Sequence, residues 1–239
     1  MSRILIVRHA QASFLSADYD RLSAVGETQA RRLGEYWSQQ KVMFDRVYSG
    51  PCVRQSDTAK IVAAVYGTAE LRFPEPVSVQ EFDEYAGEAV LRKTLPELIG
   101  RDQAIRDLHE AFLRSKDACE QRRAFQKLFE IVIGRWVDGE LAAPGVESWS
   151  DFCARVNYGL ARVASEAASN EQIAIFSSGG PIGAAMQRAL NLSPRNTLRA
   201  SWMSQNCSYS EFLFSADRFT LSAFNAFPHL DDAELLTYR

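Results

Sequence analysis

The stretch Arg3-Ile4-Leu5-Ile6-Val7-Arg8-His9 decides the fold class of this chain. From Arg3 to Val7 it is a short β-favouring run without polar alternation, which is typical of a strand buried on both faces of a sheet. The run stops abruptly at Arg8 and His9. The sequence therefore predicts an α/β fold whose first strand carries an arginine and a histidine at its carboxyl end.

Alternating strand and helix patterns continue along most of the chain. Short apolar runs predict further strands at 46–49, 76–79 and 173–176, and an antiparallel pair at 208–214 and 219–224. Apolar residues at helical spacing predict helices at 24–40, 53–66, 148–168 and 181–190. Ser23 suits the cap of the first helix, and Pro181 suits the first turn of the last. We expect a three-layer sandwich in which helices flank a mostly parallel sheet.

Residues from about 88 to 140 have a different character. This segment is charged and helix-favouring and has no strand signal, so it predicts a helical insertion packed over one end of the sheet, above any pocket there. Phe112, Arg122, Arg123 and Phe125 would either select a ligand or, more simply, pack these helices. Because no repeat or linker interrupts the chain, we expect a single domain over residues 1–239 that includes this insertion.

The charge balance excludes some classes of partner. The 239 residues carry 27 Lys and Arg against 30 Asp and Glu, a net charge of -3. The chain therefore lacks the basic excess with which proteins bind nucleic acid or anionic membranes. The apolar run before Arg8 is too short for a signal-peptide core or a membrane span, and we expect a cytoplasmic protein.

The four cysteines are widely spaced. Cys52, Cys119, Cys153 and Cys207 form no C-x-x-C pair and lie in apolar or helical contexts. Such spacing favours reduced thiols that fill core space over a metal site or a disulfide framework. We therefore expect no bound metal.

Polar residues directly follow several predicted strands. Arg8 and His9 follow the first, Arg54 the second and Glu81 the third, while Ser178 begins a Ser-Gly-Gly turn after a later one. Ligands of open α/β sheets bind outside the carboxyl ends of the strands. We therefore expect these side chains to converge, although they are distant in sequence.

Two arginines and a histidine suit a phosphoryl group. Guanidinium groups donate paired hydrogen bonds to phosphate oxygens and stay charged at any working pH. Their positive field would disfavour the imidazolium and keep His9 neutral and nucleophilic. His9 could then carry the phosphoryl group covalently, while a carboxyl group such as Glu81 protonates the leaving oxygen and later deprotonates water.

Several motifs are spread along the chain. They are LIVRHAQ at residues 5–11, Leu22-Ser23 with Gly26, Gln29 and Ala30, residues 48–51 with Arg54, Thr58 and Ala59, Glu81, and residues 145–148 with Phe152 and Arg155. In this order they resemble the RHG signature (with alanine in place of glycine), the "LT..G..QA" helix, the "SSPL.RA.QTA" segment, the "L.E" acid and the "GES..F..R" segment of the histidine phosphatase (phosphoglycerate mutase-like) superfamily. The resemblance covers most of the chain and is weakest in the insertion.

The resemblance implies a phosphohistidine mechanism of the histidine acid phosphatase type, without metal or organic cofactor. His9 would be the nucleophile, Arg8 and Arg54 the phosphate clamps, and Glu81 the proton donor. Glu84, three residues further along the same loop, is the alternative donor. The expected phosphate-binding set also includes Gln11, Ser178 and Gly179.

One position departs from the family pattern. Family members carry SHGG after a later strand, whereas this chain reads Ser177-Ser178-Gly179-Gly180. A serine hydroxyl donates one hydrogen bond but cannot supply the positive charge of an imidazolium. Loss of one such electrostatic donor lowers rates roughly a hundredfold to a thousandfold in other enzymes, and backbone donors of the glycines and the next helix would recover part of this.

Several functions are compatible with this departure. A phosphatase acting on a small phosphorylated metabolite or a phosphoprotein is the leading hypothesis, and a binder of phosphate-containing ligands without turnover is the alternative. A phosphoglycerate-type mutase is disfavoured because residues 81–87, EFDEYAG, lack the "ERHYG" motif. A generic nucleotide-binding domain is excluded because neither GxGxxG nor GxxxxGK[ST] occurs.

The expected partners are a small phosphorylated substrate or inorganic phosphate. His109 or His229 could replace the missing histidine, but a packing or surface role is the simpler interpretation of each. A homodimer is compatible with the sequence, with the last strands and residues 235–238 as a candidate interface. The residues do not specify the substrate.

Overall fold

Strand β1 (Ser2–Arg8) lies inside a six-stranded sheet of order β3-β2-β4-β1-β5-β6 in the computed structural model, which describes residues 1–13 and 20–238. It pairs in parallel with β4 (Gln172–Ser177), which pairs in parallel with β2 (Arg46–Ser49), and β2 pairs in parallel with β3 (Val77–Ser78). On its other side β1 pairs antiparallel with β5 (Tyr209–Ser215), which pairs antiparallel with β6 (Arg218–Ala226). The sheet is mostly parallel, as predicted.

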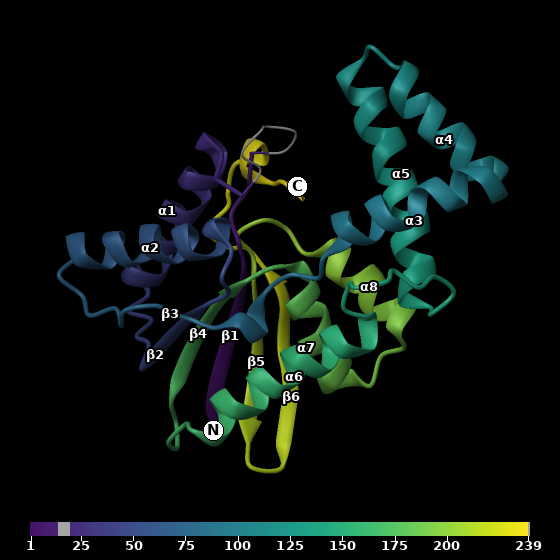
Figure 1. Cartoon of the computed structure of the whole chain (residues 1–239). Coiled ribbons are helices and arrows are strands. Elements are labelled where there is room, and N and C mark those ends of the chain that lie inside the picture. Colours follow the sequence, from purple (N-terminus) through teal and green to yellow (C-terminus); the bar gives the residue numbers. More distant parts are fainter. Residues whose placement is uncertain (14–19, 239) are drawn as a thin grey trace. The chain divides into compact units, whose positions relative to one another are not determined.

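Helices cover both faces of this sheet (Figure 1). One face carries α1 (Ala24–Gln39) and α2 (Val53–Thr68). The other carries α7 (Gly179–Leu190) and α6 (Trp149–Ser165) from Arg155 onward, and α8 (Pro194–Met203) packs against α7. The expected three-layer α/β architecture is therefore present.

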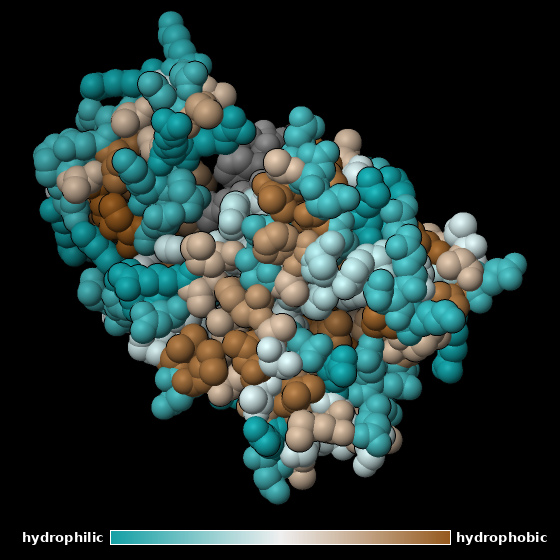
Figure 2. All heavy atoms as spheres, turned by 180° about the vertical axis from the view of Figure 1, so that it is seen from behind, coloured by the Kyte–Doolittle hydropathy of each residue, from teal (hydrophilic) through white to brown (hydrophobic). Residues whose placement is uncertain are grey.

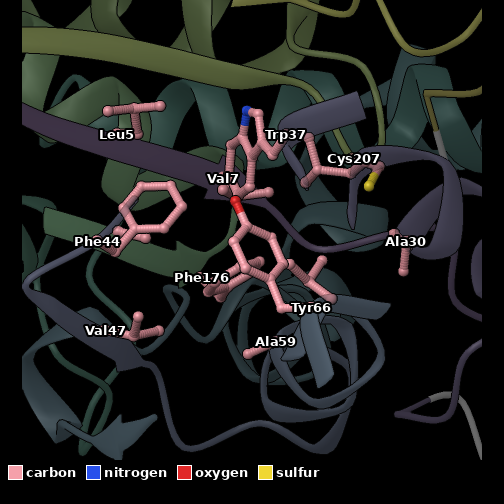
Figure 3. Close-up of a cluster of buried hydrophobic side chains, with 14 residues drawn as sticks. Leu5, Val7, Ala30, Trp37, Phe44, Val47, Ala59, Tyr66, Phe176 and Cys207 are labelled. Carbon is pink, nitrogen blue, oxygen red and sulfur yellow. The ribbon is translucent and has the colours of Figure 1, made fainter. Parts of the chain in front are cut away.

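Side-chain alternation along β1 explains why both faces are buried. Leu5 and Val7 belong to a buried cluster (Figure 3) that also contains Ala30, Leu33 and Trp37 of α1 and Ala59, Val62 and Tyr66 of α2. Ile4 and Ile6, which alternate with them, are buried as well. Successive strand residues point to opposite faces, so β1 is apolar on both sides and its polar residues come only at its end.

The predicted elements agree with the structure to within a few residues at each end, with one helix missed. Ser193 accepts a hydrogen bond from the backbone N of Asn196 at 3.4 Å, and Pro194 occupies the first turn of α8. Both are helix-start signals. This helix was therefore predictable from the sequence.

By its internal contacts the chain divides into two compact units, Met1–Glu84 with Arg155–Arg239, and Tyr85–Ala154. The second unit holds α3 (Gly87–Arg101), α4 (Gln103–Arg114) and α5 (Ala118–Val137), which confirms its helical character. The rings of Phe112 and Phe125 lie 5.7 Å apart, so they pack α4 on α5. Arg122 and Arg123 are exposed. A single domain over residues 1–239 stays a prediction.

The cysteines are all free thiols, but they do not all fill core space. Cys153 and Cys207 are buried as expected, Cys52 is half-buried and Cys119 is exposed. The interpretation was wrong for Cys119, because it lies on an outward-facing position at the start of α5.

The surface mixes polar and apolar side chains. On the face drawn in Figure 2, hydrophobic and hydrophilic residues are interspersed. Among residues 1–13 and 20–238, no helix has both the length and the apolar character that a membrane crossing requires.

Candidate active site

Backbone hydrogen bonds bring the ends of neighbouring strands together. The N–H of His9 donates to the carbonyl of Ser177 at 2.8 Å, and the N–H of Gly50 donates to that of Phe176 at 2.9 Å. Val79 donates to Ser49 at 2.8 Å. The residues that follow β1, β2, β3 and β4 therefore meet at one edge of the sheet, within the first compact unit.

His9 is buried in a defined orientation. It is 6% exposed, and its Nδ1 lies 2.8 Å from the carbonyl oxygen of Ala10. A carbonyl oxygen can only accept, so Nδ1 carries the proton. The Nε of Arg54 donates to Nε2 of His9 at 3.2 Å. Nε2 therefore has the lone pair that a nucleophile needs.

The surroundings of His9 keep its ring neutral. Burial is the largest cause and lowers its pKa well below the ordinary value, and the charges of Arg54 and then Arg8 lower it further. The hydrogen bond to Ala10 opposes them. The expectation of a neutral His9 is supported, but burial outweighs the arginine field on which that expectation was based.

Arg54 is held by Asp20, which was not among the residues predicted from the sequence. Its Nη1 pairs with Oδ1 of Asp20 at 2.7 Å, and Oδ2 of Asp20 accepts the N–H of Val53 at 2.8 Å. This carboxylate thus caps the start of α2 while it orients the guanidinium. A single aspartate in a polar loop gave no signal in the sequence.

Arg8 is anchored to two distant carbonyls. Its guanidinium donates to the carbonyl oxygen of Ser204 and to that of Tyr238, the latter at 2.6 Å. It therefore joins β1 to the end of the chain, while its charge acts on His9.

The two candidate acids lie in different environments. Oε1 of Glu81 pairs with Arg162 at 3.0 Å on the α6 side. Oε2 of Glu84 accepts the N–H of Gly180, in the first turn of α7, at 3.2 Å. Arg155 donates to the carbonyls of Gln80, Glu81 and Asp83 and so fixes the turn that separates them. The structure thus brings Glu84, and not the carboxylate of Glu81, to the Ser-Gly-Gly turn.

Ser178 has an unexpected partner. Its hydroxyl oxygen accepts a hydrogen bond from Nε2 of Gln55 at 2.7 Å, and both residues are fully buried. Gly179 begins α7 directly after it. Gln55 immediately follows Arg54 in sequence, but nothing in the sequence pointed to this contact.

Three other candidate residues have contacts of a different kind. Oε1 of Gln11 accepts the hydroxyl of Ser23 at 2.8 Å, at the start of α1. His229 is buried beside the rings of Tyr36 and Tyr209, at 6.3 and 6.5 Å, which supports a packing role. His109 lies on α4 in the helical unit.

Comparison with known proteins gives a match along nearly the whole chain. The model of the histidine phosphatase superfamily (branch 1) matches residues 4–104 and 108–226. No curated protein matches this chain in sequence.

Solved structures share the fold at low sequence identity. A phosphoserine phosphatase from Entamoeba histolytica has a TM-score of 0.61 at 17% identity, covering 96% of this chain and 100% of its own. A mycobacterial glucosyl-3-phosphoglycerate phosphatase has a TM-score of 0.60 at 20% identity, covering 94% and 98%. A phosphoglycerate mutase from Bacillus anthracis has a TM-score of 0.59 at 14% identity, covering 96% and 95%. These likenesses show the fold.

Proposed function

Because this chain belongs to the histidine phosphatase superfamily, we propose that it hydrolyses phosphomonoesters through a phosphohistidine at His9, without a metal. The observation that carries the proposal is the state of His9, which is buried and neutral, with Nδ1 tied to a carbonyl and Nε2 beside Arg54. The substrate class we propose is a small phosphorylated metabolite, with a phosphoprotein as the alternative.

The reaction would have two balanced steps. Nε2 of His9 attacks phosphorus, the bond from phosphorus to the leaving oxygen breaks, and that oxygen takes a proton from a carboxylic acid. Water then attacks the phosphohistidine, the carboxylate takes its proton, and the P–N bond breaks to release inorganic phosphate. Arg54 and Arg8 would stabilise charge on the phosphoryl oxygens throughout.

We assign the proton donor to Glu84. Its carboxylate accepts the N–H of Gly180, which lies in the first turn of α7 two residues after Ser178. The carboxylate of Glu81 instead pairs with Arg162. An acid matters most when the leaving group is a poor one. Glu84→Gln should therefore slow hydrolysis of an alkyl phosphate about tenfold more than that of a nitrophenyl phosphate, and Glu81→Gln should slow both equally. The reverse pattern would return the role to Glu81.

The decisive experiment compares wild type with His9→Ala on an aryl phosphate in EDTA. Product release and an acid-labile, alkali-stable phosphoenzyme are followed together. We expect both in wild type and neither in His9→Ala. Absence of both from wild type would favour the alternative of a phosphate binder without turnover, and transfer to an added alcohol in preference to water would indicate a mutase-type enzyme.

A further inference from the structure

The amide of Gln55 is fixed by three hydrogen bonds. Its Oε1 accepts the N–H of Cys52 at 3.1 Å, and its Nε2 donates to the carbonyl of Phe82 at 3.4 Å and to Oγ of Ser178 at 2.7 Å. An N–H can only donate and a carbonyl can only accept. The backbone therefore determines which end of the amide faces Ser178, and that end is the donor.

This contact determines how Ser178 can act. Because its Oγ accepts from Gln55, its own proton remains for another acceptor. Arg8 pairs with Ser177 across β1 and β4, and the N–H of His9 donates to Ser177. Ser178 therefore lies next in register to His9, at the carboxyl end of the neighbouring strand.

We propose that Gln55 is a positioning residue that holds the Ser178 hydroxyl as a hydrogen-bond donor towards the phosphoryl group on His9, so that the pair substitutes for the missing histidine. The inference rests on the proposed function. Ser178 touches the phosphoryl group, and Gln55 acts through Ser178.

The packing around Gln55 and Ser178 leads to a second expectation. A Cβ added at Gly50 would lie 2.1 Å from Oε1 of Gln55, so the amide occupies space that only a glycine at position 50 leaves open. An imidazole that follows the Cβ–Oγ direction of Ser178 would overlap Nε2 of Gln55, only 2.7 Å from Oγ. Histidine at 178 therefore needs a smaller residue at 55.

The first test is a double-mutant cycle of Gln55→Met, which keeps the volume and removes the donor, with Ser178→Ala. We expect each single variant to lose about tenfold in kcat and in affinity for vanadate, with KM changed less. The double variant should lose no more than Ser178→Ala alone. If Gln55→Met lowers kcat equally in both backgrounds, its role is structural and the proposal is overturned.

The second test exchanges the pair. Ser178→His alone should unfold at lower urea concentration than wild type and gain no activity. Ser178→His with Gln55→Ala should recover stability and exceed the wild-type rate. A gain of activity in Ser178→His alone, equal to that of the double variant, would contradict the proposal.

Vanadate affinity separates failure of this inference from failure of the proposed function. If wild type shows no turnover but binds vanadate, the proposed hydrolase is wrong, and the cycle on vanadate affinity still decides the role of Gln55. If wild type neither turns over nor binds vanadate, both proposals fail.

Discussion

The tautomer of His9 follows from two neighbours, the Ala10 carbonyl and the Arg54 guanidinium. Of these two neighbours, Arg54 lowers the pKa of His9 and the hydrogen bond to Ala10 raises it, while burial is the largest cause of the low pKa. The proposed nucleophile and the proposed phosphate clamp are thus coupled at the scale of single residues.

Arg54→Gln should raise the pKa of His9, because it removes one positive charge beside the imidazole. The pKa should still stay below 6.5, since burial persists. A titration of His9 by NMR in both proteins checks this. Arg46→Gln, at the opposite end of β2 and paired with Glu171, is the matched control and should leave the His9 pKa unchanged.

His229 should make the protein less stable in acid. Burial lowers its pKa to about 4 in the folded state, whereas the unfolded chain takes up the proton near pH 6.5. Above pH 6.5 both states are neutral, so the loss of stability begins below pH 6.5 and is complete near pH 4, reaching at most about 3 kcal/mol.

His229→Phe removes this titration while keeping a ring beside Tyr36 and Tyr209. The difference in free energy of unfolding between variant and wild type, measured by urea titration, should grow in favour of the variant as pH falls from 6.5 to 4. A difference that stays constant over this range would refute the burial argument.

Three helices begin beside the site, and the starts of α2 and α7 carry candidate site residues. α1 follows Ser23, whose hydroxyl accepts the N–H of Gly26 at 3.0 Å, α2 carries Arg54, and α7 begins at Gly179. The close approach of α1 to the loop after His9 requires Gly26, because a Cβ there would lie 2.1 Å from the carbonyl oxygen of Gln11.

Two glycine replacements should therefore have opposite effects. Gly67→Ala, in α2 with nothing within 4 Å of the added Cβ, should raise the free energy of unfolding by about 0.5 to 1 kcal/mol through helix propensity. Gly26→Ala gives the same gain in helix propensity, but the clash of its Cβ with the backbone of Gln11 should lower the free energy of unfolding overall. Urea unfolding of both variants measures this, and a stabilised Gly26→Ala would show that α1 can shift.

At the scale of the whole first unit, the end of the chain folds back onto α1 (Figure 1). Nε2 of buried Gln29 donates to the carbonyl of Leu235 at 2.7 Å and to the hydroxyl of Thr237 at 2.9 Å. The N–H of Asn206 donates to the carbonyl of Thr237 at 2.8 Å. Residues 235–237 thus satisfy buried donors of their own chain, and a homodimer through this tail stays a prediction.

Truncation after Asp232 should leave those donors of Gln29 and Asn206 unsatisfied, at about 1 to 3 kcal/mol each. We expect a large fall in the midpoint of urea unfolding. Truncation after Thr237 is the control: it keeps these bonds and removes Tyr238, a partner of Arg8 and Gln205, and Arg239. It should preserve stability, and similar midpoints for the two truncations would contradict this role of the tail.

The sequence by itself determined the order of the elements, the α/β class and the identity of the superfamily. Periodicity along one segment indicates which faces that segment buries, so β1, α1 and α2 were predictable. The candidate residues Arg8, His9 and Arg54 were found because they stand at the ends of these elements. The covering of a pocket by residues 88–140 stays a prediction.

Only the tertiary structure decided which side chains meet. The contact of Gln55 with Ser178, of Asp20 with Arg54 and of Glu84 with Gly180 each join residues from different elements. A side-chain hydrogen bond requires donor and acceptor to lie about 3 Å apart. Sequence spacing does not indicate which side chains of different elements come that close. The sequence was therefore sufficient to recognise the superfamily, whereas the partners of Arg54, Glu84 and Ser178 became known only from the fold.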